Sequence, residues 1–590
     1  MDDTNSLIEQ RKAKLAALEA KGIQPFRNAF KPDTGCGTAR ERFEKGEIPE
    51  GTQVLIAGRI TAHRDMGKSQ FIDLKDVTGR LQVYAQKQAI GDEQFEIFKH
   101  LDLADFIGAK GTLFRTRTGE PSVKLESFVI LSKALRPPPA KWEGLADPEI
   151  RYRQRYLDLI SSDEVKATFL KRSQIVREIR NFFHERGYVE VETPMMQAIP
   201  GGAAAQPFKT HHNALGCEFY MRIALELYLK RMLVGGVDKV FEIGRNFRNE
   251  GLSRRHNPEF TMLEAYEAYG DYATMMETVE SLVKRLAERV VGKLTLPRTL
   301  AVEPARHLIE LGLQQPFGIG AQWGRFESAQ AEGYRFLSGL LSRPAAEIGF
   351  ADILKARSTC MEFKQWYKEL HPDWKSSGSV PIEIQTFNRL ERALRPYSES
   401  EIDLNIWHKP RYRDLVRAAV SEMTEGLVPD WFALSLEERK NVAINQLGLA
   451  GDIAAGYEDF EVTGAVFEKL VEPTLIQPTF VTHLPKQLVP LAKLDPEDPT
   501  SVEVFECCIN GQEISPGYSE QNDPIAQREA LEHQAGGEQQ KLDEDFLVAL
   551  EHGMPPAGGI GIGIDRLCMM LLGQESIRDV ILFPQLRPKA

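Results

Sequence analysis

The stretch that decides the fold runs from Phe241 to Tyr272 and reads FEIGRNFRNEGLSRRHNPEFTMLEAYEAYGDY. Its first part together with the preceding valine, VFEIGRNFRNE, and its last part, EFTMLEAYEAY, alternate with the period of a β-strand. The polar segment GLSRRHNP between them predicts the turn of a hairpin. We therefore expect Arg248 and Glu250 on one face of the first strand, and Glu264 and Tyr266 on one face of the second.

The hairpin carries three arginines and a histidine at and near its turn. Arginine offers a rigid bidentate fork to phosphate, so these side chains together predict a preformed anion-binding site. A charged hairpin face exposed to water is the alternative interpretation of the same block.

A second block, GGIGIGIDRLCMMLLG from Gly558 to Gly573, predicts a glycine-rich strand that runs into an apolar helix. Glycines at every second position leave one face of the strand without side chains, so a bulky ligand can lie against the backbone. Arg566 then places a cation at the start of the helix. Close packing between helix and strand would explain the glycines equally well. Gly559, Gly561 and Gly563 resemble the glycines of a dinucleotide-binding fingerprint, but the third of them falls one position too early for that motif.

A third block, VEVFECCINGQEISPGYSE, carries Glu506 and Glu513 on either side of a turn at Asn510 and Gly511. Two carboxylates on paired strands can share a divalent cation that also bridges phosphate oxygens, an arrangement that Mg²⁺ favours. Two solvated glutamates in a hairpin are the alternative.

The composition is that of a globular protein with more than one core, since the chain has 590 residues and 42% of them are hydrophobic. The net charge of −12 argues against general attraction to nucleic acid but leaves room for a local basic face. The six cysteines form no CxxC pair, so neither a zinc site nor disulfides are expected. The charged N-terminal segment predicts a helix and not a signal peptide. The sequence contains no run of about 18 apolar residues, so no membrane span is expected. A cytoplasmic enzyme is expected.

The pattern along the chain predicts an α+β protein. Short alternating runs with glycine turns predict a small antiparallel barrel, and the tetrapeptide MGKS within it predicts a hairpin turn, because a phosphate-binding loop would need glycine where residue 62 is Ala. The expected parts are a helical extension at 1–50, the barrel at 51–140 with the proline-rich linker RPPP near its end, the first part of a helix-and-strand domain at 147–298, an inserted and mainly helical module of unknown role at 299–408, and the second part at 409–590.

In their order and spacing these blocks resemble the signature of class II aminoacyl-tRNA synthetases. The segment Ile175–Pro194, ending GYVEVETP, looks like motif 1, FEIGRNFRNE…RHNPEF looks like motif 2, and GIGIGIDR looks like motif 3. The stretches MMQAIPGGAAAQPFKTHHNAL, RIALELYLKR, RYRQRYLDLI, LIQPTF, ALEHGMPPAGG and IRDVILFP narrow the resemblance to the lysyl-tRNA synthetase family.

The resemblance implies an OB-fold barrel that binds the anticodon, followed by a catalytic domain built on an antiparallel sheet flanked by helices. It also implies a homodimer whose interface includes motif 1, and the substrates ATP, L-lysine and tRNA(Lys), with Mg²⁺ as the metal. Arg248 and Arg566 would be the catalytic arginines, holding the α- and γ-phosphates of ATP. The other implied ATP-binding residues are Glu250, His256, Asn257 and Phe260, the implied metal ligands are Glu506 and Glu513, and the implied anticodon contacts are Phe71 and Gln82.

For the amino acid, the resemblance implies Gly202 and Glu264 at the α-amino group, Glu226 and Glu520 at the side-chain ammonium, and Tyr266 and Tyr518 as aromatic walls. Elementary chemistry requires the same kind of slot, because burying an unpaired ammonium is prohibitively costly. The chain departs from the family pattern at three positions: Pro516 replaces an Asn, Gln206 an Arg and Leu225 a Pro. A related ligase for another amino acid and a non-catalytic lysine-sensing or RNA-binding paralogue are the alternatives.

Overall fold

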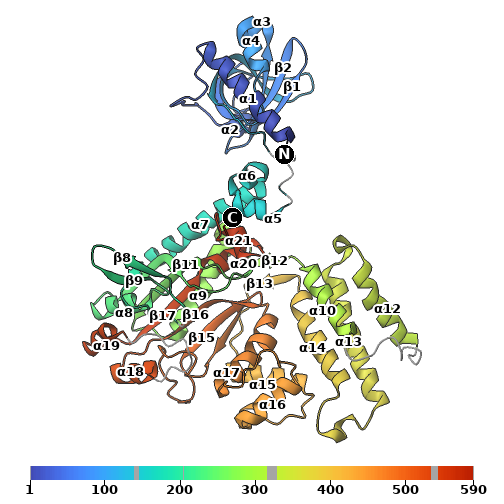
Figure 1. Ribbon diagram of the computed structural model, residues 1–590, viewed down its shortest axis with the longest axis vertical. Coiled ribbons are helices and arrows are strands. Elements are labelled where there is room, and N and C mark those ends of the chain that lie inside the picture. The colour runs from blue at the N-terminus through green and yellow to red at the C-terminus, as the bar shows by residue number, and fades with distance from the viewer. Residues whose placement is uncertain are drawn as a thin grey trace. The chain divides into compact units, whose positions relative to one another are not determined.

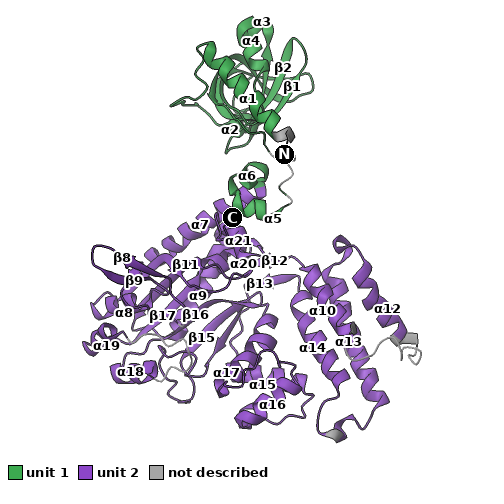
Figure 2. Ribbon diagram, viewed as in Figure 1, with its two compact units in different colours: residues 1–163 green, residues 164–590 purple. Residues whose placement is uncertain are grey.

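The computed structural model describes residues 2–138, 145, 147–203, 205–314, 328–532 and 543–588. These form two compact units, residues 1–163 and 164–590 (Figure 2). The first unit also includes two short helices, α5 (Pro148–Arg153) and α6 (Arg155–Ser161).

The first unit contains a closed five-stranded barrel with the strand order β1-β2-β3-β5-β4 (Figure 1). Alternate residues of these strands point inward, so that Ile56, Ile72 and Val83 are fully buried. The predicted hairpin turn at MGKS joins the first two strands, with Gly67 at a φ of 77° and the amide of Met66 bonded to the carbonyl of Ser69. The strands are β1 (Gln53–Asp65), β2 (Ser69–Lys75), β3 (Arg80–Gln86), β4 (Phe106–Arg115) and β5 (Pro121–Ser132), with α3 (Lys87–Ile90) and α4 (Asp92–Lys99) between β3 and β4.

Two N-terminal helices, α1 (Asp2–Ala20) and α2 (Cys36–Glu44), pack on this barrel and share its core through Leu18, Cys36 and Phe43. At Gly37 the helix comes so close that a Cβ would lie 2.0 Å from the carbonyl oxygen of Thr78. The segment expected as a helical extension is therefore part of the barrel's packing.

The second unit is built on a seven-stranded sheet with the order β14-β15-β16-β17-β11-β10-β6. Its neighbouring strands are antiparallel, except for the parallel pair β6 and β10. The strands are β6 (Val189–Glu190), β10 (Lys239–Phe247), β11 (Glu259–Ala268), β14 (Thr479–Thr482), β15 (Val504–Ile509), β16 (Gln512–Ser519) and β17 (Ala557–Gly563). The expected α+β class and antiparallel catalytic sheet are confirmed.

The hairpin β10–β11 forms as predicted, but its first strand is shorter than expected. The strand ends at Phe247, so Arg248 and Glu250 lie in the connecting loop and not on a strand face. Pro258 supplies the physical reason. Its carbonyl accepts the Arg248 amide at 2.8 Å, but proline has no N–H with which to continue the ladder. The Arg248 carbonyl turns to the amide of Glu250 instead, at 2.9 Å.

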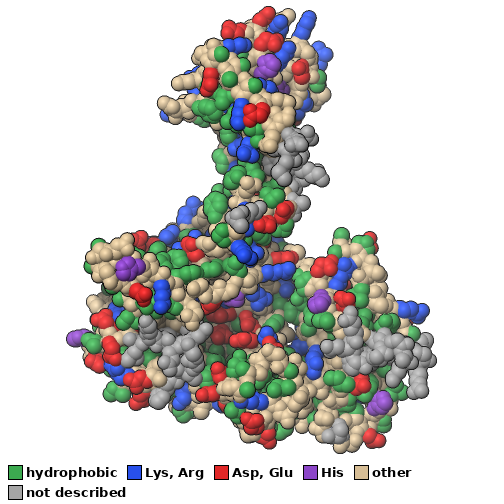
Figure 3. Space-filling model, viewed as in Figure 1, with side chains coloured by type: hydrophobic (Ala, Val, Ile, Leu, Met, Phe, Trp, Pro, Cys, Tyr) green, Lys and Arg blue, Asp and Glu red, His purple; other side chains and the backbone are tan. Residues whose placement is uncertain are grey.

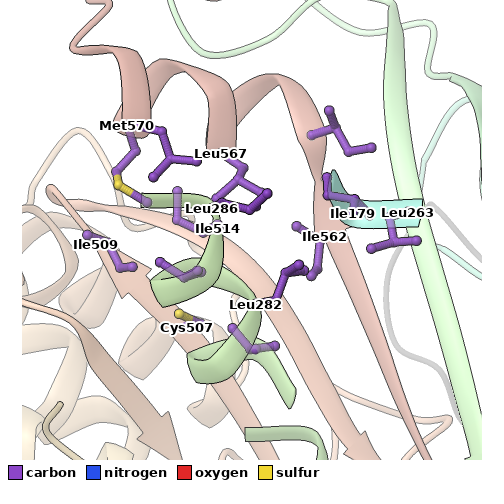
Figure 4. Close-up of a cluster of buried hydrophobic side chains, with 14 of the residues drawn as sticks. Ile179, Leu263, Leu282, Leu286, Cys507, Ile509, Ile514, Ile562, Leu567 and Met570 are labelled. Carbon is purple, nitrogen blue, oxygen red and sulfur yellow. The ribbon is translucent and has the colours of Figure 1, made fainter. Parts of the chain in front are cut away.

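Helices cover the sheet and form the main core with it. Figure 4 shows side chains of α7 (Asp163–Glu185), α9 (Tyr272–Leu286) and α20 (Ile564–Leu572) meeting side chains of the sheet, among them Ile179, Leu282, Leu567, Leu263 and Ile562. Each such fully buried side chain contributes roughly 1.5–3 kcal/mol relative to its exposed state. The other helices near this sheet are α8 (Glu226–Val234), α18 (Pro524–Glu532), α19 (Glu544–Glu551) and α21 (Ile577–Val580), and a small sheet contains β7 (Met196–Gln197), β8 (Lys209–His212) and β9 (Cys217–Met221).

The inserted module is helical, as expected. Its described helices are α10 (Val302–Gln314), α12 (Ser328–Ser342), α13 (Phe350–Leu370) and α14 (Ile382–Leu394), which enclose a core of their own. The chain enters and leaves the module through the paired strands β12 (Thr295–Pro297) and β13 (Glu401–Asp403). After the module, α15 (Tyr412–Met423), α16 (Leu436–Asn445) and α17 (Asp459–Val466) pack around Trp431 beside the sheet.

In the parts of the chain that the structure describes, no helix combines the length and apolar character needed to cross a membrane.

Candidate active site

A cavity of about 190 Å³ lies where the three predicted blocks meet in the second unit. The β10–β11 loop contributes Arg248 to its wall, β16 contributes Glu513 and α20 contributes Arg566. Residues that are more than 300 positions apart in the chain thus converge on one space. The remaining lining includes Glu250, Arg255, His256, Asn257, Phe260, Met262, Ile514, Pro516, Gly563 and Asp565.

Arg248 is the more buried of the two predicted catalytic arginines. Its guanidinium lies 5.3 Å from the centre of the Phe260 ring, and its Nε is buried without a hydrogen-bond partner among the described residues. Burial lowers the pKa of Arg248, because the charged form loses water, although nearby carboxylates such as Glu250 and Glu513 oppose this. A buried cation with an unused donor favours an anionic ligand in the cavity.

Arg566 is held in place by the opposite wall of the cavity. One of its terminal nitrogens donates to the carbonyl of Glu513 at 3.0 Å, and the other donates to Nε2 of His256 at 3.0 Å. Burial and the charge of Arg566 lower the pKa of His256, so its neutral ring accepts at Nε2 and donates from Nδ1 to Ser253. This chain of bonds fixes the loop of the hairpin to the first turn of α20.

The other predicted ATP-binding residues also line this cavity. Glu250 follows Arg248 in the loop, and Phe260 extends from β11. The side chain of Asn257 is held by the backbone, since its Nδ2 donates to the Glu259 carbonyl at 2.5 Å and its Oδ1 accepts from the Gln585 amide at 3.2 Å.

Carboxylates crowd beside Glu513. Glu506 on β15 is partly buried, and burial, followed by the charges of Glu513, Glu472 and Glu468, raises its pKa well above the usual range. Glu472 accepts the backbone N–H of Glu513 at 3.2 Å. Such repulsion between acidic groups is relieved when a divalent cation binds, so the predicted ligands Glu506 and Glu513 fit a metal. Among the described residues, no group of three or more His, Cys, Asp or Glu side chains is arranged to hold a metal ion by itself.

The residues predicted to bind lysine form a second cluster, in which the side chains of Glu226, Glu264, Tyr266 and Glu520 are buried. Glu226 begins α8 and accepts the Tyr518 hydroxyl at 2.6 Å. Glu264 on β11 accepts the Tyr266 hydroxyl at 2.9 Å, and burial raises its pKa to about 7, with the charge of Glu226 adding to the shift. Glu520 follows β16, and burial raises its pKa to about 8. Gly202 has a φ of 87° and lies against Glu226, where its own Cβ would be 3.4 Å from that of the glutamate.

Sequence reasoning missed one member of this cluster. Lys230, one helical turn after Glu226, is fully buried and forms ion pairs with both Glu226, at 2.7 Å, and Glu520. Its ammonium also lies 5.5 Å from the centre of the Tyr518 ring. The only signal in the sequence was a Glu and a Lys four positions apart, which on a helix usually means a solvent-exposed pair.

Two of the three departures from the family pattern have a structural consequence. The backbone N–H of Leu225 donates to Glu264 at 3.1 Å, a bond that proline at this position could not make. Pro516 lies opposite Glu506 on the paired strand and lines the 190 Å³ cavity. The side chain of Gln206 has no explanation in the structure.

The two residues predicted to contact an anticodon lie in the other unit, on adjacent strands of the barrel. Phe71 stacks on Tyr84 with ring centres 4.7 Å apart, and Tyr84 in turn lies 5.8 Å from Phe114. Gln82 accepts a hydrogen bond from the hydroxyl of Ser122 at 2.8 Å. A partly exposed aromatic group beside an amide is suited to stack on unpaired bases.

Comparisons with known proteins match both units. Residues 147–587 match the family model of class II tRNA synthetases (D, K and N), and residues 54–131 match that of the OB-fold nucleic acid binding domain. A lysine–tRNA ligase of Pelotomaculum thermopropionicum is 41% identical over 594 aligned positions, which cover 100% of this chain and 96% of that protein. Lysine–tRNA ligases of Syntrophomonas wolfei and Bacillus subtilis are 40% and 39% identical, and each alignment covers at least 99% of this chain and 98% of the relative. The chain therefore belongs to the class II tRNA synthetases, and within them to the family of the lysine–tRNA ligases.

Proposed function

We propose that this protein is a lysine–tRNA ligase, which activates L-lysine with ATP and transfers it to the 3′ end of tRNA(Lys). The observation that carries the proposal is the pair of buried carboxylates, Glu226 and Glu520, in a slot on the same sheet that supplies the arginine-lined cavity. Strands β11 and β16 each contribute to both places, through Phe260 and Glu264 on one and Glu513 and Tyr518 on the other.

In the first step the lysine carboxylate attacks the α-phosphorus of ATP, and pyrophosphate leaves as lysyl-adenylate forms. In the second step a hydroxyl of the terminal ribose of the tRNA attacks the activated carbonyl and AMP leaves. Neither step needs a nucleophilic side chain, so acceleration comes from positioning and charge neutralisation. Arg248 and Arg566 serve these roles, with Phe260, His256, Glu250 and Asn257 around the nucleotide.

The slot selects lysine by charge and by shape. Both oxygens of Glu520 are buried, and Oε1 has neither a hydrogen bond nor an ion pair among the described residues, so it can take the ammonium of the substrate. Tyr266 and Tyr518 supply apolar walls for the methylene groups. An acidic substrate would meet three carboxylates here and is excluded.

Mg²⁺ is the metal we propose, held by Glu506 and Glu513. When bound, it neutralises charge on the phosphate oxygens of ATP. The two glutamates themselves orient its site, with Glu472 fixing the backbone of Glu513.

We also propose the partners of the protein and its location in the cell. The barrel binds the anticodon through Phe71 and Gln82, and the protein works in the cytoplasm. We also propose a homodimer, because apolar side chains stay exposed in and around the segment that resembles motif 1. Leu170 is 52% exposed and Met196 is 52% exposed, and the others are Val189, Met195 and Ile199.

Amino-acid-dependent exchange of pyrophosphate into ATP, measured with each of the twenty amino acids in turn, tests the proposed function. Lysine is expected to support exchange at least about a hundredfold better than any other amino acid, because its side-chain ammonium fits the unpaired Oε1 of Glu520 beside Lys230. Arg566→Ala is expected to reduce exchange about 10²- to 10³-fold, since one donor to the transition state is lost. Equal exchange with a different amino acid would point to a related ligase, and no exchange with any would point to a non-catalytic paralogue.

A further inference from the structure

A second and larger cavity, of about 520 Å³, lies where the inserted module meets the catalytic domain. The loop of the β10–β11 hairpin supplies Arg254 and Arg255 to its wall, and the inserted module supplies Arg389 and Tyr397. The end of α20 and the turn between β15 and β16 close it from the side of the sheet. Arg255 lines both this cavity and the one assigned to ATP, so the two spaces adjoin.

The lining of this cavity is strongly basic. Its charged members are five arginines and a lysine against Glu575 alone: Arg254, Arg255, Arg298, Arg389, Arg392 and Lys469. Two of these cations are neutralised nearby, Arg392 by Glu422 at 2.6 Å and Lys469 by Asp452 at 2.8 Å. Figure 3 shows Lys and Arg side chains along the hollow between the catalytic domain and the inserted helices.

The other arginines have no carboxylate within ion-pair distance among the described residues. Arg298 donates to neutral acceptors, the side chain of Asn510 at 2.7 Å and the carbonyls of Pro396 and Glu399 at 2.6 Å each. The guanidiniums of Arg254 and Arg255 carry no hydrogen bond in the described structure. Cations gathered in this way repel one another unless an anion lies between them.

Arg389 is held in a fixed position in the wall of the cavity. The backbone at Gly448, at a φ of 78°, comes so close that a Cβ there would lie 2.5 Å from the guanidinium carbon. One terminal nitrogen donates to Gln385 at 2.8 Å, while Nε is buried without a hydrogen-bond partner in the part of the chain described. Burial lowers the pKa of Arg389. A partly buried arginine with an unused donor is costly, and a bound anion offsets that cost.

The rest of the wall includes apolar and aromatic side chains as well as neutral polar ones. Tyr397 lies within reach of the charges of Arg255, Arg254 and Arg298, and Leu447, Leu449, Met569 and Met570 complete the surface. Guanidiniums beside an aromatic ring and aliphatic side chains fit a ligand that has both a phosphate and a flat base. The volume lies in the range of sites that enclose small molecules of this size.

We propose that this cavity binds a free nucleoside phosphate. Arg254, Arg255 and Arg389 hold the phosphate from two sides, and Tyr397 contacts the base. The inserted module thereby supplies one wall of a ligand site that adjoins the ATP cavity.

The test is a binding titration of the full-length protein in which the first cavity is filled with a sulfamoyl analogue of lysyl-adenylate. The probes are ADP and a tRNA(Lys) transcript with or without its 3′-terminal nucleotide. Arg389→Ala and Arg254→Ala remove one cation from each side of the cavity, and each is expected to weaken binding at least about tenfold, the loss of one charged hydrogen bond. The matched control is Arg335→Ala, an exposed arginine of α12 that does not line the cavity.

Weaker binding of ADP in both cavity variants, with Arg335→Ala unchanged, identifies a free nucleotide as the ligand. Weaker binding of the complete transcript alone, with no effect on ADP or on the shortened transcript, would assign the cavity to the end of the tRNA substrate and overturn the proposal. Equal affinities for ADP in the wild type and all three variants, or no binding of ADP, also overturn it. Lysine-dependent pyrophosphate exchange in the same variants reports separately on the proposed function and is expected to stay unchanged. Arg254 is exposed on a loop, so its variant keeps the test valid if Arg389→Ala fails to fold.

Discussion

The Nζ of Lys230 lies 2.7 Å from Oε1 of Glu226, one helical turn earlier on α8, and pairs at the same time with Glu520. The chain thus places one of its own ammonium groups between the two carboxylates that we propose for the substrate. Burial opposes the charge on Lys230, but the two glutamates outweigh it and raise the pKa of this lysine. The slot is already adapted to an ammonium before any ligand enters.

Replacing Lys230 with methionine removes the cation and leaves its two partners buried. We expect the free energy of unfolding to fall by about 3–5 kcal/mol, because removing one partner of a buried pair leaves the other partner's buried polar group uncompensated. We also expect the KM for lysine to rise at least about tenfold while the KM for ATP stays within about twofold. Urea unfolding and pyrophosphate exchange measure the two effects.

Lys239→Met is the matched control for this change. Lys239 pairs with Glu267 at 2.7 Å near the surface, so its loss is expected to cost no more than about 1 kcal/mol and to leave the KM for lysine unchanged. A Lys230→Met protein with wild-type stability and wild-type lysine affinity would show that the buried lysine has no part in the slot.

Binding of lysine is expected to release protons at neutral pH. In the empty slot burial raises the pKa of Glu264 to about 7 and that of Glu520 to about 8, so both hold protons that the unfolded chain would lose near its ordinary value of 4.5. Their contribution to stability is therefore full below about pH 4.5 and is lost as the pH rises through 7 to 8. The two ammonium groups of lysine favour the ionised carboxylates and drive the protons off.

Calorimetry of lysine binding at pH 7, in two buffers with different ionisation enthalpies, measures this release. About one proton per lysine is expected, and fewer in Glu520→Gln, whose amide carries no titrating proton. A binding enthalpy that is the same in both buffers would refute the assignment of these pKa values.

The glycine strand β17 gives a pair of matched substitutions. A Cβ at Gly559 would lie 1.9 Å from Oε1 of Glu520 and 2.6 Å from the Tyr266 ring, whereas at Gly561 the nearest atom is the terminal methyl of Met262 at 2.8 Å. We expect Gly559→Ala to raise the KM for lysine at least about tenfold, by displacing two walls of the slot, and Gly561→Ala to have a much smaller effect. Equal effects of the two substitutions, measured by exchange, would place the slot elsewhere.

A substitution on the RNA-binding face of the barrel is expected to affect only the tRNA-dependent step. Phe71→Ala removes a stacking platform worth about 1–3 kcal/mol per base, so the KM for tRNA in aminoacylation should rise roughly 5- to 150-fold. Pyrophosphate exchange needs no tRNA and should stay unchanged. Loss of exchange, or a wild-type KM for tRNA, would contradict the role proposed for this residue.

The sequence predicted what local patterns encode. Alternation placed the strands of the barrel and the β10–β11 hairpin, and the run of glycines into Arg566 gave β17 and α20 with few errors in their bounds. Strand β10 ends early because Pro258 has no N–H to continue the ladder, and the alternation of side chains does not reveal this. The resemblance to a family then supplied the candidate residues of the site.

What the sequence did not predict depends on contacts between distant residues. Lys230 and Glu520 are 290 positions apart, so only the packing of α8 against the end of β16 reveals their pairing. In the same way, the basic cavity joins Arg254 of the hairpin loop to Arg389 of the inserted module. Each of these segments alone has the pattern of an ordinary solvated surface.

The most direct measurement is a structure of the protein with L-lysine, a non-hydrolysable ATP analogue and Mg²⁺. We expect the triphosphate to lie between Arg248 and Arg566, with the metal at Glu506 and Glu513. We also expect the side-chain ammonium of the ligand within hydrogen-bonding distance of Oε1 of Glu520, beside Lys230. A lysine ligand bound away from Glu226 and Glu520, or a triphosphate that contacts neither arginine, would contradict the proposed site.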